Sequence, residues 1–304
     1  MVGLFGFDKL GFDSFPKLQF YYWGGIPEAL RQLGCKVLIT KVPRYDTLLS
    51  TLTISTGTIA ERAAAMNDFL ARTLEKNTEV NFLAHSMGGL DCRHLITHIN
   101  PTYYRPISLT TLSTPHRGSS FMDFCRDYLG LGRISPKKST TSKSSTTAYV
   151  EPPTVATGPS DFDKSRSLSS TILTHTMLAR TLDTPAYANL TTSFLQNTFN
   201  PMTPDSPQVE YYSFGAVIPT EQSGETGLPI WHPLYLPHKV VTEREGRDND
   251  GLVSLKSARW GKFVGKLACD HWVSPSIIPH FPFQQKILIF QSLPRQNLSP
   301  TPPQ

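Results

Sequence analysis

Val80–Leu90, VNFLAHSMGGL, determines which fold this chain adopts. An apolar run typical of a buried strand leads to a serine between small residues, and a helix-like sequence follows. In such a strand–turn–helix the serine has a strained backbone, so the residues two positions before and after it must be small. Ala84 and Gly88 meet that requirement around Ser86. The turn would raise the serine hydroxyl above the sheet edge, where the start of a helix favours negative charge. An ordinary strand-to-helix turn is the alternative interpretation.

The segments on either side of this turn predict alternating strands and helices. Short apolar runs indicate buried strands, and apolar residues at helical spacing indicate amphipathic helices. Strands that alternate with helices favour a mostly parallel sheet with helices on both faces. The expected strands are Lys36–Val42, Glu79–Ala84, Pro106–Ser113 and Val209–Ala216; the expected helices are Thr58–Glu75, Gly88–Ile99 and shorter pieces between Thr171 and Phe199.

Length and composition fit one large α/β domain with an insertion. The chain has 304 residues, of which 39% are hydrophobic and 17% charged, and it contains 25 prolines. We expect a core made of residues 1–115 and 205–290, interrupted by an insertion over 116–204. Within the insertion, residues 136–170 are rich in Ser, Thr, Pro and Lys, which predicts disorder. The polar, proline-rich residues 292–304 are expected to be a disordered tail.

Charge and cysteine usage exclude several classes of protein. The net charge of +5 comes partly from Lys137, Lys138 and Lys143, a cluster typical of a solvated loop, and nothing resembles a nucleic-acid-binding module. The four cysteines are widely spaced, which favours reduced thiols and an intracellular protein. We find no apolar run of about 18 residues and no signal peptide. The mitochondrion and the cytoplasm both remain open, as does the oligomeric state, and no cofactor is expected.

Several motifs in a fixed order carry a resemblance to a known family. The serine motif is followed by Thr110–Ser119 (TTLSTPHRGS), then Asp250–Ser254 (DGLVS), then Asp270–His271, and the chain opens with Gly3–Asp8 (GLFGFD). Together they resemble the bacterial true lipases of the pseudomonad type and the fungal mitochondrial triacylglycerol lipases. The resemblance runs in blocks from residue 3 to about residue 271. It implies an α/β-hydrolase fold, with the insertion acting as a lid that covers the pocket.

The resemblance also implies a role for particular residues. Ser86 would be the nucleophile, His271 its base and Asp250 the carboxylate that orients the base, in the order Ser, Asp, His that this fold uses. The backbone N–H groups of Leu4 and Met87 would form the oxyanion hole. The alternatives are Asp248 for the carboxylate and His232, His238 or His280 for the base, while His116 is interpreted as a structural residue that supports the rim of the site.

The chain departs from the family pattern in three places. Val2 stands where the family has a histidine after a hydrophobic strand, so we expect a sheet that lacks its first central strand. Arg44–Ser55 looks like an insertion, and the sequence after His271 diverges. Our hypothesis for all three is a gene model with a misplaced start and unspliced intron sequence. Val273 replaces an acidic residue that binds calcium in the bacterial enzymes; because its side chain cannot ligate a hard cation, no metal site is expected.

The function expected from the sequence is hydrolysis of the carboxylic ester bonds of acylglycerols through an acyl-enzyme, as in a serine lipase or esterase. The expected partner is a lipid ester substrate, presented by a lipid-droplet or membrane surface. Two alternatives stay open. One is an inactive, truncated relative of the hydrolases, and the other is an acyltransferase or phospholipase that uses the same three residues.

Overall fold

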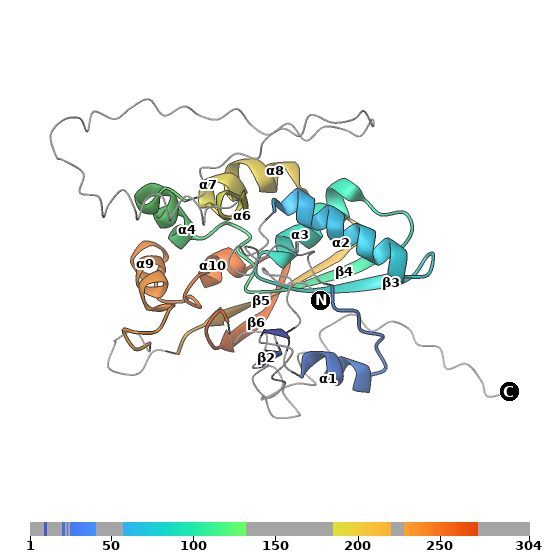
Figure 1. Ribbon diagram of the computed structural model, residues 1–304, viewed down its shortest axis with the longest axis horizontal. Coiled ribbons are helices and arrows are strands. Elements are labelled where there is room, and N and C mark those ends of the chain that lie inside the picture. Colours follow the sequence, from blue (N-terminus) through green and yellow to red (C-terminus); the bar gives the residue numbers. More distant parts are fainter. Residues whose placement is uncertain are drawn as a thin grey trace, which may run out of the picture.

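The computed structural model describes residues 9–10, 20–21, 23, 25–40, 57–131, 185–219 and 228–272. Its centre is a four-stranded, fully parallel sheet in the order β3-β4-β5-β6 (Figure 1). The strands are β3 (Glu79–His85), β4 (Arg105–Leu112), β5 (Glu210–Val217) and β6 (Lys262–Ala268). The predicted strands at 79–84, 106–113 and 209–216 are thereby confirmed, and every end agrees to within one residue. A separate antiparallel pair joins β1 (Lys9–Leu10) to β2 (Phe20–Tyr21).

The strand predicted at Lys36–Val42 is not observed over its described part, residues 36–40, which are not assigned to any strand. Its side chains still alternate between the two faces of the fold. Val37 and Ile39 pack against one core cluster, whereas Leu38 packs against the other. The apolar alternation therefore predicted where the side chains point, but a strand also needs a backbone ladder, which alternation does not encode.

The helices cover both faces of the sheet. α2 (Ile59–Thr73) begins at a capping box, in which the Thr58 side chain accepts from the Glu61 N–H and the Glu61 side chain accepts from the Thr58 N–H. α3 (Gly88–His94) continues as a π-helical turn, η3 (Leu95–Ile99), so the predicted helices at 58–75 and 88–99 are confirmed. The remaining helical segments are α1 (Ile26–Gln32), α4 (Ser120–Phe124), η4 (Cys125–Leu129), α6 (Pro185–Asn189), α7 (Thr192–Phe194), η5 (Leu195–Phe199), α8 (Asn200–Met202), α9 (Tyr235–Glu245) and α10 (Leu255–Ala258).

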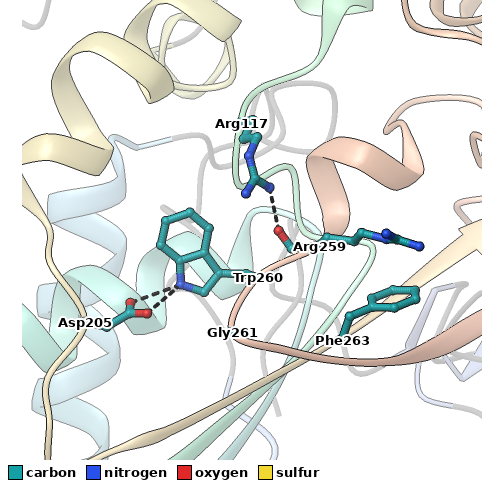
Figure 2. Close-up of a pocket in the computed structure, with 6 residues that line it drawn as sticks. All are labelled: Arg117, Asp205, Arg259, Trp260, Gly261 and Phe263. Atoms are coloured by element: carbon teal, nitrogen blue, oxygen red, sulfur yellow. Dashed lines mark hydrogen bonds between the residues drawn. The ribbon is translucent and has the colours of Figure 1, made fainter.

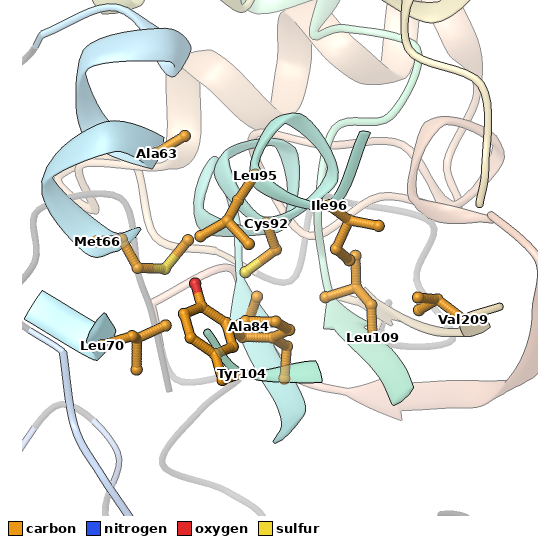
Figure 3. Packing of buried hydrophobic residues seen from close by; sticks show 11 residues of the cluster. Ala63, Met66, Leu70, Ala84, Cys92, Leu95, Ile96, Tyr104, Leu109 and Val209 are labelled. Carbon is orange, nitrogen blue, oxygen red and sulfur yellow. The ribbon is translucent and has the colours of Figure 1, made fainter. Parts of the chain in front are cut away.

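Two buried clusters hold these layers together. The first fills the space between the sheet and the helices α2 and α3, where Met66, Leu70, Leu95 and Tyr104 surround the β3 residue Ala84 (Figure 3). The second lies between α1 and the strands β4, β5 and β6. Figure 1 shows α1 on the side of the sheet opposite to α2 and α3. The buried members of this second cluster are Trp23, Ile26, Leu112, Phe214, Ala216, Leu267 and Cys269. Because helices cover both faces, the carboxyl-terminal halves of β3, β4 and β5 are largely buried, including polar residues such as Thr110 and Thr111.

The described ends of the insertion pack on the core and on each other. The Asp123 carboxylate in α4 accepts from the Thr192 N–H at 3.0 Å and from the Thr192 hydroxyl at 2.6 Å. α4 is also fixed to α9, because Glu245 accepts from the Ser120 N–H at 3.1 Å. The two ends of the insertion therefore leave and rejoin the core at adjacent points. Its boundaries at 116–204 and its role as a lid stay predictions.

Several expectations fall outside the described residues. These are the disorder over 136–170, the tail at 292–304, the extra segment Arg44–Ser55 and the missing first strand before Leu4. Within the described ranges, no helix has the length and apolar character needed to cross a membrane.

Candidate active site

Ser86 lies on a sharp turn between β3 and α3. Its φ of 55° is in the left-handed region, which a non-glycine residue adopts only when its surroundings hold it there. Two hydrogen bonds do so, because the Ser86 N–H donates to the Leu112 carbonyl at 2.9 Å and the Thr114 hydroxyl donates to the Ser86 carbonyl at 2.7 Å. The turn is thereby anchored to the carboxyl end of the neighbouring strand, β4.

The small residues around Ser86 allow α3 to approach β4. A Cβ atom on Gly89 would lie 2.3 Å from the Thr114 hydroxyl oxygen and 2.8 Å from a methyl carbon of Thr111. Both distances are far below van der Waals contact, so the serine turn requires a residue without a side chain at this position.

The structure brings Ser86, Asp250 and His271 together at the carboxyl end of the parallel sheet. His271 follows β6, and its Nε2 lies 2.9 Å from the Ser86 Oγ. Its Nδ1 lies 2.8 Å from the Asp250 Oδ2. The Asp250 Oδ1 accepts from the backbone N–H groups of Leu252 at 3.0 Å and Val253 at 2.8 Å, which fixes the carboxylate. When a carboxylate orients an imidazole and the imidazole contacts a hydroxyl in this way, the imidazole can take the hydroxyl proton and activate the oxygen as a nucleophile.

All three side chains are removed from water, since Ser86, Asp250 and His271 are each at most 3% exposed. In a site of low dielectric, the Asp250 carboxylate stabilises an imidazolium at His271 more strongly than it would in water. The backbone supports the same pairing, because the His271 N–H donates to the Asp250 carbonyl at 2.8 Å.

His85 contacts the imidazole from the side, with ring centroids 4.8 Å apart. Burial lowers the pKa of His85 well below 6.5, and the charge that His271 can carry lowers that pKa further. A neutral ring therefore packs beside His271. The sequence motif includes His85 and Thr114, but sequence reasoning gave neither a role. The only sign of a role in the sequence was that each residue lies within one of the two motifs. Their contacts, His85 with His271 and Thr114 with Ser86, join residues from different elements and cannot be predicted from local sequence.

Of the two expected oxyanion donors, Met87 is described. Its side chain is buried, and its backbone N–H donates to no acceptor among the residues that the structure describes. Buried backbone N–H groups are nearly always paired, so a free one immediately after the serine is suited to an incoming oxyanion. Leu4 lies outside the described residues.

None of the described alternatives for the carboxylate or the base has a hydrogen bond to Ser86 among the described residues. Asp248 is exposed and forms a 3.8 Å ion pair with Lys266. His238 is buried on α9, and neither of its ring nitrogens has a hydrogen-bond partner in the described part of the chain. The Nδ1 of His232 accepts from the Leu234 N–H at 3.2 Å. His280 lies outside the described residues.

His116 is buried. Its Nε2 lies 3.1 Å from the Thr111 hydroxyl oxygen, and its ring stacks on Trp260 with centroids 5.1 Å apart. A buried hydrogen bond and a stacked ring are the contacts expected of a structural residue.

A shallow pocket of about 420 Å³ lies away from Ser86, Asp250 and His271 (Figure 2). It is found where the chain enters β6, whereas His271 follows the other end of that strand. Trp260 donates its indole N–H to Asp205, and Arg117 donates to the Arg259 carbonyl. These contacts brace the amino end of β6. No cluster of three or more potential metal-binding side chains occurs among the described residues.

Comparison with known proteins identifies relatives for most of the chain. A family model described as "Putative serine esterase (DUF676)" matches residues 55–145. Triacylglycerol lipase 2 of Saccharomyces cerevisiae is 32% identical over 266 residues, which covers 84% of this chain and 62% of that protein. The triacylglycerol lipase of Pseudarthrobacter phenanthrenivorans is 34% identical over 108 residues, which covers 36% of this chain and 31% of that protein. The chain therefore spans less than two thirds of the length of these curated relatives.

Solved structures share the fold. Lipase 1 from Pelosinus fermentans superposes with a TM-score of 0.52 at 15% identity and covers 97% of this chain and 98% of its own. The lipase of Staphylococcus hyicus gives a TM-score of 0.52 at 15% identity, over 96% of this chain and 95% of its own. Similarity at this level of identity bears on the fold alone, and it confirms the expected α/β-hydrolase architecture. The chain therefore has an α/β-hydrolase fold, and its sequence is similar to a family model described as a serine esterase and to proteins named triacylglycerol lipase.

Proposed function

We propose that this protein hydrolyses carboxylic esters through an acyl-enzyme formed on Ser86. One observation carries the proposal: the His271 imidazole lies 2.9 Å from the Ser86 Oγ and 2.8 Å from the Asp250 Oδ2. A serine hydroxyl is a poor nucleophile until a base removes its proton, and the base must be held in the correct tautomer.

In the proposed reaction, the Ser86 Oγ attacks the ester carbonyl carbon while its proton passes to the His271 Nε2. The Met87 N–H stabilises the negative charge that forms on the carbonyl oxygen. The imidazolium, stabilised by Asp250, then gives its proton to the leaving alcohol, and the acyl-enzyme remains. A water molecule activated by the same imidazole attacks the acyl-enzyme, which releases the carboxylic acid and restores Ser86.

We further propose acylglycerols as the substrates. Support comes from the 32% identity to a yeast protein named triacylglycerol lipase 2. Water and an alcohol compete for the same acyl-enzyme, so product analysis with glycerol present tests hydrolysis against acyl transfer.

Labelling with a fluorophosphonate probe tests the nucleophile. The probe should modify Ser86, and Ser86→Ala should abolish labelling and reduce ester hydrolysis by a factor of order 10⁶. Ser113→Ala is the matched control, because Ser113 is also buried and has a positive φ of 48° at the end of the neighbouring strand. That variant should keep its labelling. Equal labelling of wild type and Ser86→Ala would contradict the proposal.

A further inference from the structure

The His85 side chain packs against the imidazole of His271. His85 is the last residue of β3 and directly precedes Ser86. The two ring centroids lie 4.8 Å apart with the ring planes inclined at 46°, and both residues are at most 3% exposed. This contact is therefore shielded from water, and it joins the strand that carries the proposed nucleophile to the loop that carries the proposed base.

A hydrogen bond joins the same two residues. Burial, and then the charge that His271 can carry, lower the pKa of His85, whereas a hydrogen bond between its ring and the His271 backbone raises that pKa. A hydrogen bond has this effect on a base when a ring N–H donates to a carbonyl, because such a bond favours the protonated form. A neutral imidazole has one N–H to donate, so this acceptor also selects the nitrogen that carries the proton.

The loop after β6 reaches β3 only through these contacts with His85 and Ser86. In the sheet order β3-β4-β5-β6, the strand β6 is the third strand beyond β3, which corresponds to about 14 Å at the usual strand spacing. The Cys269 N–H donates to the carbonyl of Val217 at the end of β5 at 3.1 Å, and the His271 N–H donates to the Asp250 carbonyl at 2.8 Å. Both of these bonds hold the loop at a distance from the strand of the serine.

Asp250 by itself does not fix the orientation of the imidazole. The contact of 2.8 Å between the His271 Nδ1 and the Asp250 Oδ2 holds one edge of the ring. The second side-chain torsion of a histidine is soft, so the ring can still turn about this edge and carry Nε2 away from the Ser86 Oγ. A buried ring packed against the imidazole opposes that movement. The contacts of His85 do not involve the Oγ, so they also act after the Oγ has become part of the proposed acyl-enzyme.

We propose that His85 is a positioning residue, whose ring contact and backbone hydrogen bond hold the His271 imidazole at Ser86 in both halves of the reaction. This inference rests on the proposed function, because it concerns the base of that reaction. Misplacing a reacting group by about 1 Å can lower a rate about 100-fold. His85→Ala removes both contacts, so it should lower the kcat for p-nitrophenyl acetate about 100-fold with little change in KM.

Two further variants separate the two contacts. The side-chain amide of His85→Asn can donate to the same carbonyl but has no ring, whereas His85→Phe keeps a ring against His271 but has no donor. A net hydrogen bond accounts for about tenfold at most, so each variant should recover about tenfold of the kcat that His85→Ala loses. If His85→Ala does not fold, these two variants decide, and a wild-type kcat in both would overturn the proposal.

His94→Ala is the matched control for a buried histidine that packs on another histidine. The His94 ring lies 4.5 Å from the His98 ring, and His94 is also buried. His94→Ala should lower the urea denaturation midpoint but leave kcat unchanged, whereas His85→Ala should lower both. A kcat of His85→Ala within about twofold of the wild type, or an equal loss of kcat in His94→Ala, would show that His85 is only part of the core.

Proton NMR tests the position of the imidazole without hydrolysis. The proton between the His271 Nδ1 and the Asp250 Oδ2 should give a resolved downfield resonance, which is assigned by its loss in Asp250→Asn. In His85→Ala this resonance should broaden or move upfield, because the imidazole is held less firmly, and an unchanged resonance would contradict the positioning role. If the wild type hydrolyses no ester, the proposed function fails, while the resonance still tests whether His85 holds His271.

Discussion

At the scale of single residues, the proposed chemistry depends on a few groups that hydrogen bonds hold in place. Ser86 has a positive φ, and its backbone is fixed by Leu112 and Thr114 rather than by its own sequence neighbours. One oxygen of the Asp250 carboxylate accepts from two backbone N–H groups, and the other oxygen contacts the His271 Nδ1. Each group is therefore oriented before a substrate arrives, which reduces the reorganisation that the proposed reaction needs.

Asp250 provides a residue-scale prediction. Asp250→Asn replaces the carboxylate that orients His271 by an amide of almost the same shape, which favours the wrong imidazole tautomer. We expect the kcat for a soluble ester to fall by about 10⁴ with little change in KM. Asp248→Asn is the control, because Asp248 is exposed and its carboxylate lies 3.8 Å from the Lys266 ammonium group rather than beside His271. A larger loss from Asp248→Asn would reassign the carboxylate.

At the scale of elements, the serine turn depends on how α3 packs on β4. The hydrogen bond from Thr114 to the Ser86 carbonyl crosses between these two elements at the point where Gly89 leaves room for it. The sequence motif predicted the strand, the turn and the helix, since all three are local. It did not predict that the residue two positions after β4 holds the turn, because that contact depends on the pairing of β3 with β4.

Gly89→Ala tests this packing. The added methyl group would overlap Thr114 and Thr111, so we expect the free energy of unfolding to fall by about 1–3 kcal/mol. Labelling of Ser86 by the fluorophosphonate probe should slow as well, since the turn must shift. Gly265→Ala in β6 is the control, because within the described part of the chain no atom of another segment lies within 4 Å of a Cβ there. Similar urea denaturation midpoints for the two variants would argue against tight packing at Gly89.

At the scale of the whole molecule, buried neutral histidines make stability depend on pH. Burial lowers the pKa of His94 to about 4 and lowers the pKa values of His85 and His116 well below 6.5. In the unfolded chain each pKa returns to about 6.5, so below that pH the unfolded state binds more protons than the folded state. The folded state is therefore favoured above pH 6.5 and loses stability as the pH falls.

We expect the free energy of unfolding to decrease between pH 6.5 and pH 5, where most carboxylates remain ionised. Each such histidine contributes a slope of at most about 1.4 kcal/mol per pH unit. Urea denaturation across this range measures the slope. His116→Gln should lower stability at every pH but make the profile less steep. A profile independent of pH would contradict the prediction.

The sequence by itself determined the local features of this protein. Hydrophobic periodicity and small residues act over a few positions, so they predicted the elements that depend on local sequence. These are the strand–turn–helix at Val80–Leu90, the helix at Thr58–Glu75 and the strands β3, β4 and β5. Periodicity did not reveal β6 or α9, and it predicted a strand at Lys36–Val42 that the described residues do not form.

The tertiary structure decided which distant residues meet. Asp250 and His271 were candidates among several acids and histidines, and their selection in sequence rested on a family resemblance. Parallel strands place their carboxyl ends along one edge of the sheet, and only that arrangement brings a residue after β3 within 2.9 Å of a residue after β6. Proximity across a sheet arises from long-range packing, which no pattern of neighbouring residues encodes.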